Sequence, residues 1–255
     1  MSALLSGEHA LITGVASGIG RGMARALHAE GAQLAVVDID AERGGNVASE
    51  VGATFIQADL STEAGARVAF EEATKALGTI SIFVHSASPP RRESQTVLAV
   101  TGTEWDAMVN TNLRSGFILG QAIAKHMIAE KVRGKMLFVT SLHANSPRNL
   151  PHYSAAKAGE TMLVKEFARA LGPHGIRVNA IAPGAIPGGG FAADVSALES
   201  MIALGRTGTP EDIASMAVAL LSDRFSGYVT GTTVVVDGGL ALYNWIPASA
   251  PIESP

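Results

Sequence analysis

The stretch HALITGVASGIGRG, residues 9–22, carries a short apolar run directly into a glycine-rich turn. The run is typical of a buried strand, and residues 18–30 after the turn have helical length. Glycine lets a backbone approach a pyrophosphate closely, and the N-terminus of a helix favours negative charge. Such a turn is also found as a simple tight connection. Its place between a first strand and a helix favours nucleotide binding, with the spacing G-x-x-x-G-x-G rather than G-x-G-x-x-G.

The rest of the chain repeats this alternation of apolar runs and helical patterns. The runs are continuous, which is typical of parallel strands covered on both faces. They span residues 9–13, 33–37, 54–56, 80–84, 136–139, 177–182 and 232–236. The helical patterns span residues 18–30, 41–50, 62–77, 104–131, 152–171 and 210–221. Ser61 or Thr62 and Thr103 are suitable helix-start residues.

This order predicts an α/β fold with one Rossmann-like domain over residues 1–255. We expect a doubly wound parallel sheet of about seven strands, with helices on both faces. Residues 88–103 and 185–205 fit neither pattern, and residues 246–255 are expected to form an irregular tail.

Composition restricts the class of protein. The chain has 255 residues, of which 47% are hydrophobic, and it has no cysteine, which excludes disulfides, thiolate catalysis and cysteine zinc sites. The net charge is −4 with no long basic run, so neither nucleic acid nor an anionic membrane is an expected partner. The sequence shows no signal peptide and no run of about 18 apolar residues, so we expect a cytoplasmic protein without a membrane span.

Tyr153 and Lys157 stand four residues apart, and Ser141 follows the apolar run at 136–140. Residues i and i+4 share one face of a helix, so the phenol and the ammonium would project together. A free phenol, with a pKa near ~10, is a poor acid–base at neutral pH, and a nearby cation favours its ionised form. A tyrosine in such a site can exchange a proton with a substrate oxygen. The same spacing also occurs on ordinary amphipathic helices.

Asp38 ends the second predicted strand, 18 residues after Gly20. A carboxylate there can accept hydrogen bonds from the adenosine ribose and would repel a 2′-phosphate, which favours NAD over NADP. The alternative is that Asp38 caps the next helix, and nearby Arg43 would offset part of its charge. Asp59 and Leu60, after the third strand, are candidates for adenine contact, or Asp59 is an ordinary helix-start residue.

Taken together, these motifs resemble the compact form of the short-chain dehydrogenase/reductase family over roughly residues 6–240. Any one of them is weak, and all of them in this order are specific. Those not yet described are Asn112 within VNTNL, residues 109–113; RVNAIAPG, residues 177–184; RTGTPEDIA, residues 206–214; and YVTG, residues 228–231, through VDGG, residues 236–239.

The resemblance implies a role for each matching residue. Ser141 and Tyr153 would hydrogen-bond the reacting oxygen, Lys157 would contact the nicotinamide ribose and support the ionised phenol, and Asn112 would hold a water of the proton relay. The reaction would be hydride transfer between a secondary alcohol and NAD, with Tyr153 as the acid–base. The implied cofactor contacts are Gly14, Ser17, Gly18, Ile19, Gly20, Asp38, Asp59, Leu60, Ser86, Ala87, Tyr153, Lys157, Pro183, Gly184 and Ile186.

The sequence departs from the family pattern at two places. His85-Ser86-Ala87-Ser88 stands where the family has Asn-Asn-Ala-Gly, which leaves the adenosine side of the site open to question. After Ile186-Pro187, three glycines at 188–190 stand near the usual position of a threonine. They favour either a substrate lid over residues 185–205 or a loop without fixed structure.

The substrate is less clearly indicated. Ser141-x-His143 before the Tyr153 motif is similar to bacterial sugar dehydrogenases of the family, and His143 would bind a polyhydroxylated substrate or face solvent. Arg91, Arg92 and Arg148 would bind a carboxylate, as in a sugar acid, or be solvated. The expected substrate is therefore a sugar, polyol or related hydroxy compound. A 3-oxoacyl thioester reductase and a non-catalytic NAD-binding protein are the alternatives.

Two further expectations concern partners. No metal ion is expected. The resemblance implies a homotetramer packed through residues 104–131 and 152–171, in which Met162, Phe167 and Leu171 would serve the interface or the core.

Overall fold

The computed structural model describes residues 3–92, 95–187 and 195–242. Seven strands in this part of the chain form one parallel sheet in the order β3-β2-β1-β4-β5-β6-β7. The strands are β1 His9–Thr13, β2 Gln33–Asp38, β3 Thr54–Gln57, β4 Ile82–His85, β5 Lys135–Val139, β6 Arg177–Pro183 and β7 Thr233–Val236. The predicted doubly wound sheet is confirmed, and each strand lies within two residues of its predicted bounds.

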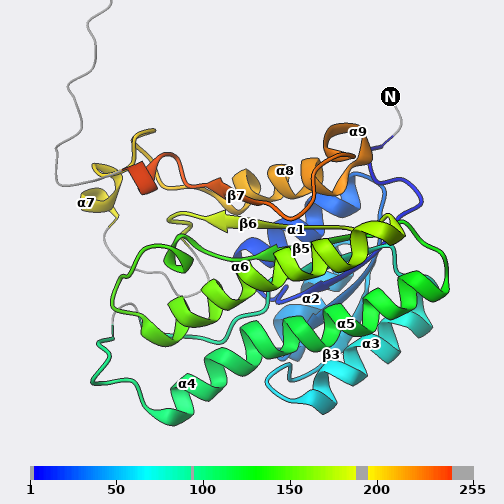
Figure 1. Cartoon of the computed structure of the whole chain (residues 1–255), viewed down its shortest axis with the longest axis horizontal. Helices are drawn as coiled ribbons and strands as arrows, with labels where there is room; N and C mark the ends of the chain where they lie inside the picture. Colours follow the sequence, from blue (N-terminus) through cyan, green and yellow to red (C-terminus); the bar gives the residue numbers. More distant parts are fainter. Residues whose placement is uncertain (1–2, 93–94, 188–194, 243–255) are drawn as a thin grey trace, which may run out of the picture.

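Helices connect the strands (Figure 1). They are α1 Gly18–Ala29, α2 Ala41–Glu50, α3 Glu63–Leu77, α4 Gly102–Val109, α5 Ser115–Ala129, α6 Pro151–Leu171, α7 Ser196–Glu199, α8 Pro210–Leu221 and α9 Asp223–Ser226. Shorter turns of other types are the π-helical η1 Asn110–Arg114 and the 3₁₀ segments η2 Leu142–Ala144, η3 Gly172–His174 and η4 Leu240–Leu242.

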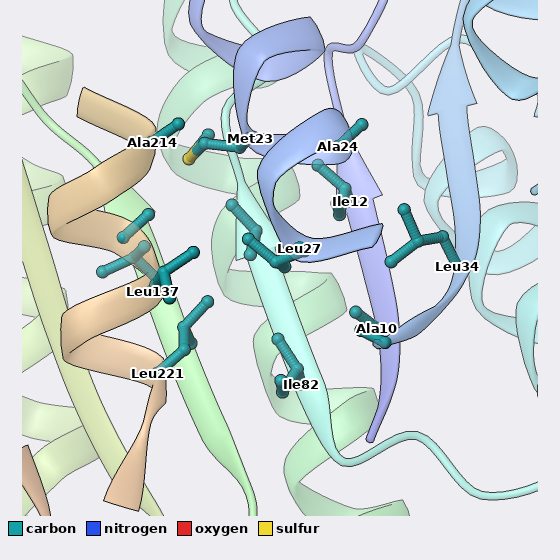
Figure 2. Packing of buried hydrophobic residues seen from close by; sticks show 14 of the residues in the cluster. Ala10, Ile12, Met23, Ala24, Leu27, Leu34, Ile82, Leu137, Ala214 and Leu221 are labelled. Atoms are coloured by element: carbon teal, nitrogen blue, oxygen red, sulfur yellow. The ribbon is translucent and has the colours of Figure 1, made fainter. Parts of the chain in front are cut away.

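Alternate residues of each strand pack on opposite faces of the sheet, as the twofold period of a strand requires. On β1, Ala10 and Ile12 join a core with α1, α2 and α8, whereas Leu11 joins a second core with α3, α5 and α6. Figure 2 shows side chains of α1 and α8 meeting over strands β1, β4 and β5 in the first of these cores. The two cores leave the carboxyl ends of the strands free for a site.

Helix starts follow capping residues in the sequence. Thr62 caps α3 by accepting a hydrogen bond from the Gly65 amide at 3.0 Å, as one of the two predicted start residues there. The predicted start at Thr103 is wrong, because α4 begins two residues earlier. Thr101 and Glu104 form a reciprocal capping box, which satisfies two N–H groups at once and therefore determines the first turn.

The single helix predicted over residues 104–131 is a chain of three segments. Between α4 and α5 the backbone widens into η1, where the Ser115 amide donates to the Asn110 carbonyl, five residues back. Segments of this kind are rare and often occur at functional sites. Asn112 lies in the middle of η1.

The strand order reverses direction between β1 and β4, and ligands of doubly wound sheets bind at this crevice. The loops after the two strands approach closely there. A Cβ atom on Gly14 would lie 2.6 Å from the Ala87 Cα atom, and Gly14 has a φ of +75°. Only glycine fits both conditions.

Part of the predicted lid, residues 188–194, lies outside the described residues, and so does the predicted tail at 246–255. The described part of the lid contains α7. Among the described helices, none is both long and apolar enough to cross a membrane.

Candidate active site

A cavity of about 1030 Å³ opens at the carboxyl edge of the sheet. It reaches from the turn after β1 past the end of β2 to the N-terminal half of α6. The structure brings most of the predicted site residues to its walls: Gly14, Ser17, Gly18, Ile19, Gly20, Asp38, Ser86, Ser141, His143, Tyr153, Lys157, Pro183, Gly184 and Ile186. Four predicted residues, Asn112, Asp59, Leu60 and Ala87, are not among the lining residues.

The glycine-rich turn presents an anion-binding end of a helix to this cavity. Ser17 is the N-cap of α1, and its side chain makes no capping hydrogen bond. The first N–H groups of a helix have no partner within the helix, so they are available to a phosphate. Gly18 has a φ of +54°, and a Cβ built on it would meet no atom within 4 Å, so the space over the turn is open. The residues present fit a dinucleotide pyrophosphate.

Asp38 is tied into the same turn. Its Oδ2 atom accepts a hydrogen bond from the Ala16 amide at 2.8 Å, and its Oδ1 atom accepts from the Asp40 amide at 3.0 Å. The helix cap is Asp40, which accepts from the Arg43 amide, so the alternative role of Asp38 as the cap of α2 is wrong. A carboxylate oxygen accepts more than one hydrogen bond, so Asp38 keeps capacity for ribose hydroxyls.

The segment after β3 contributes less to the cavity than the resemblance implies. The Oδ1 atom of Asp59 accepts from the Ser61 amide at 2.9 Å, next to the cap of α3. Leu60 is buried. Both arrangements are those of an ordinary strand-to-helix turn, so adenine contact by Asp59 and Leu60 stays a prediction.

Ser141, Tyr153 and Lys157 are buried side chains that line the cavity together. The Lys157 Nζ atom donates to the Val139 carbonyl at 2.8 Å and lies 5.7 Å from the centre of the Tyr153 ring. The Ser141 Oγ atom accepts from the His143 amide at 3.2 Å, which orients it at the end of β5. The structure therefore brings the strand-end hydroxyl, the phenol and the ammonium to one cavity, and their catalytic roles stay predictions.

Asn112 lies in η1 and is not among the residues that line the cavity. It is fully buried, and its Nδ2 atom donates to the Met108 carbonyl at 2.9 Å. Its Oδ1 atom has no hydrogen-bond partner among the described residues. Its main-chain carbonyl accepts from the Nε2 atom of His85 at 2.8 Å, which joins η1 to the end of β4.

Two side chains with basic groups line the cavity and pack against the phenol ring of Tyr153. The Arg91 guanidinium carbon lies 4.1 Å above the centre of the Tyr153 ring, and the His143 ring meets the same ring edge-on at 5.5 Å. Burial, followed by the charges of Arg91 and Arg148, lowers the pKa of His143 to about 4. His143 is therefore neutral at neutral pH and able to accept or donate a hydrogen bond. Arg148 also lines the cavity, whereas Arg92 pairs with Glu104 at 3.8 Å.

The structure adds one residue that sequence reasoning missed. Glu160 lies one turn beyond Lys157 on α6, fully buried, with its Oε2 atom 2.7 Å from the Lys157 Nζ atom. The spacing of three residues between an acid and the site lysine was the available signal. Among the described residues, no group of three or more histidines and acids is placed to hold a metal ion.

A family model described as Enoyl-(Acyl carrier protein) reductase matches residues 14–241 of the chain. Two similar curated proteins are 3beta-hydroxysteroid dehydrogenase 1 of Eggerthella lenta and the probable galactose dehydrogenase GalD of Rhizobium meliloti. The first is 36% identical, over 94% of this chain and 95% of its own length. The second is 34% identical, over 90% of this chain and 93% of its own length.

Three solved structures are also similar. A short-chain type dehydrogenase/reductase from Mycobacterium marinum has a TM-score of 0.86 and 34% identity, covering 94% of this chain and 97% of that one. A 3-ketoacyl-(acyl-carrier-protein) reductase from Brucella melitensis with NADH has a TM-score of 0.88 and 33% identity, covering 93% and 99%. A short chain dehydrogenase from Burkholderia cenocepacia in complex with NADP has a TM-score of 0.86 and 29% identity, covering 93% of this chain and 99% of that one. With a family model, curated relatives and solved structures matched over nearly its whole length, the chain belongs to the short-chain dehydrogenase/reductase family.

Proposed function

We propose that this protein transfers a hydride between a secondary alcohol and NAD, with Tyr153 as the acid–base. One observation carries this proposal: Ser141, Tyr153 and Lys157 line the same cavity as the glycine-rich turn and Asp38. When bound, the nicotinamide cofactor supplies the hydride chemistry, and the protein supplies position and proton control. Ser141 would hydrogen-bond the reacting oxygen, while Tyr153 would exchange its proton.

The cofactor would lie along the turn after β1. The N–H groups at the start of α1 would hold the pyrophosphate, and Lys157 would bind the nicotinamide ribose. Asp38 would accept hydrogen bonds from the adenosine ribose hydroxyls. Asn112 would support the proton relay through its Oδ1 atom, which has no hydrogen-bond partner among the described residues.

Charge supports NAD over NADP. The Asp38 carboxylate would repel a 2′-phosphate, and the two amides that it accepts from keep it in place. Arg43 lines this end of the cavity, and its Nε atom forms an ion pair with the Asp40 Oδ2 atom at 2.6 Å. Its positive charge is therefore already partly offset and would attract a 2′-phosphate less strongly. The similar structures include both an NADH and an NADP complex, so the preference rests on these residues.

The substrate class that we propose is a sugar, polyol or related hydroxy compound. The similarity to the probable galactose dehydrogenase supports this class. Neutral His143 beside the phenol would hydrogen-bond a substrate hydroxyl. Neither Arg91 nor Arg148 has an ion pair within the described residues, and a guanidinium in this position favours a substrate that carries a carboxylate near its hydroxyl group.

The runner-up is a 3-oxoacyl thioester reductase. The family model's description and the Brucella melitensis relative support it, whereas Asp38 disfavours the phosphorylated cofactor. A non-catalytic NAD-binding protein is the third candidate, and the complete set of Asn112, Ser141, Tyr153 and Lys157 argues against it.

Three further expectations belong to this proposal. The protein is proposed to be cytoplasmic and a homotetramer packed through α4, α5 and α6, where Phe117 and Met162 are exposed. Phe167 packs on the core and Leu171 is buried in it, which leaves Met162 as the interface candidate of the three named from the sequence. The lid role of residues 185–205 stays a prediction. Light scattering of the purified protein tests the oligomeric state.

Initial rates with aldoses, polyols, sugar acids and 3-hydroxyacyl thioesters, each with NAD and with NADP, test the function. We expect NAD-dependent oxidation of a hydroxy compound, and activity confined to 3-hydroxyacyl thioesters with NADP would contradict the proposal. A sugar acid and its neutral methyl ester then test Arg91. Arg91→Met should lower kcat/KM for the acid about tenfold or more relative to the ester, because charged hydrogen bonds contribute about 1.5–3 kcal/mol. The ester reports the effect of losing the charge above the Tyr153 ring. Arg92→Met is the matched control, since Arg92 pairs with Glu104.

A further inference from the structure

The interior behind Lys157 contains a carboxyl group that the proposed reaction does not use. Glu160 is on α6 with 0% exposure, and its Oε2 atom lies 2.7 Å from the Lys157 Nζ atom. Neither of its oxygens has another hydrogen bond among the described residues. Burying a carboxyl group without such partners is costly, so its presence calls for a physical reason beyond packing.

His85 faces Glu160 from the end of β4. Its Nε2 atom lies 3.7 Å from the Glu160 Oε1 atom and donates to the Asn112 carbonyl at 2.8 Å. The Thr13 hydroxyl oxygen accepts from the Ser86 amide at 3.1 Å, so its own proton is free to be donated to the Nδ1 atom of His85, also at 3.1 Å. These partners assign a neutral ring with its proton on Nε2.

Two unusual residues, His85 and Glu160, are therefore next to each other in the interior. His85 replaces the first asparagine of the family pattern, and Glu160 places an acid on a buried face of α6 between Ala156 and Val164. Burial and the charge of Lys157 lower the pKa of His85 to about 4. Burial raises the pKa of Glu160, and the ammonium of Lys157 opposes that rise.

We propose that Glu160 is a positioning residue for Lys157: it holds the ammonium beneath Tyr153 and offsets part of its charge. Glu160 thereby sets the positive potential at the phenol, and His85 supports it from β4. This inference rests on the proposed roles of Tyr153 and Lys157. Because the Lys157 Nζ atom is 5.7 Å from the centre of the phenol ring, a change in the charge beside it reaches the phenol.

Among the titratable groups near α6, Glu160 is the acid that pairs with Lys157. His143 and Arg91 approach Tyr153 from the substrate side. The titratable groups on the elements that pack against α6 are either exposed or engaged elsewhere: Glu104 with Thr101, Asp106 exposed, Arg114 with Glu63, Lys125 exposed, His126 with the Ile80 amide, His174 exposed, and Arg177 with Asp223.

The pH profile of kcat for alcohol oxidation at saturating NAD tests this inference. Glu160→Gln keeps an acceptor oxygen beside Lys157 and removes the negative charge, so the uncompensated ammonium favours the ionised phenol. We expect the acidic limb of the profile to move to lower pH by about one unit. Glu166→Gln, which removes the same charge from an exposed position on α6, should leave the limb in place. An unmoved limb in Glu160→Gln, or a shift to higher pH, would overturn the inference.

Circular dichroism and NAD binding first establish that the variant is folded. If Glu160→Gln does not fold, Glu160→Asp supplies the test, because it keeps the charge and withdraws it from the ammonium by one methylene. The same limb should then move in the same direction by a smaller amount, and no movement would overturn the inference. Failure of the proposed function is distinguishable, because Tyr153→Phe would then keep its turnover whatever the Glu160 variants do.

Discussion

The Oδ2 atom of Asp38 accepts a hydrogen bond from the main-chain N–H of Ala16 at 2.8 Å, which joins the end of β2 to the glycine-rich turn after β1. The proposed ribose-binding carboxylate and the proposed phosphate-binding turn are thus one unit. Their relative position does not depend on a ligand to bring them together.

Asp38→Asn should therefore weaken NAD use and relax the exclusion of NADP. Hydrogen bonds to a charged group contribute about 1.5–3 kcal/mol, so we expect kcat/KM with NAD to fall about 10- to 100-fold. The ratio of kcat/KM values for NAD and NADP should fall with it. Asp106→Asn is the control, because Asp106 is an exposed residue of α4 that does not line the cavity. An unchanged ratio in Asp38→Asn would show that another group selects the cofactor.

Stability should fall as the pH is lowered, and His85 should account for part of that fall. Its folded pKa of about 4 lies below the ordinary 6.5, so the unfolded chain binds the extra proton in the window between these values. The contribution of neutral His85 to the free energy of unfolding is fully present above pH 6.5, and it is lost as the pH falls from 6.5 toward 4. For His85 alone we expect a loss of about 2 kcal/mol between about pH 7 and about pH 5.

Urea unfolding of the wild type and of His85→Asn at the two pH values measures this contribution. The variant should show a shallower dependence, with the residual slope including His143 and His152, whose pKa values burial also lowers. The raised pKa of Glu160 acts with the opposite sign and is retained in both proteins. Equal slopes in the two proteins would mean that His85 has the same pKa in the folded and the unfolded chain, which would contradict this account.

Gly20→Ala should damage both the fold and the cofactor site. A Cβ atom at this position would overlap with the Gly14 carbonyl oxygen. This oxygen belongs to the main chain, so it cannot rotate away as a side chain could. Overpacking of this kind costs about 1–3 kcal/mol, and we expect weaker NAD binding as the turn shifts. Gly45→Ala is the matched control in α2, where the Cβ would meet nothing within 4 Å. It should stabilise the protein by about 0.5–1 kcal/mol in thermal unfolding.

Much of the architecture could be predicted because it depends on local pattern. Continuous apolar runs such as residues 82–84 are buried on both faces, and Thr62 accepts a hydrogen bond from the nearby Gly65 amide. The π-helical segment at Asn112 could not be predicted from local pattern, because its contact partner His85 lies on β4, far away in the sequence. The role of Glu160 was missed for the same reason, since burial of the acid becomes visible only when β4 and α6 are brought together.

The site residues also divide into those that local spacing could place and those that it could not. Tyr153 and Lys157 share a helix face through their spacing alone, and Ser141 follows the strand that β-sheet order places beside them. The position of Arg91 above the phenol depends on a loop without a repeating pattern, so spacing gave no means to place it.

Tyr153→Phe tests the central claim most directly, with NAD and the hydroxy compound that the substrate survey identifies. The change removes one oxygen atom and leaves the ring under Arg91, so NAD affinity measured by fluorescence titration should stay near that of the wild type. General acid–base groups contribute about 10²–10⁴-fold, and we expect turnover to fall by at least that range. Tyr228→Phe, at an exposed tyrosine, should change neither quantity. A folded Tyr153→Phe protein that binds NAD and turns over substrate at the wild-type rate would contradict the account.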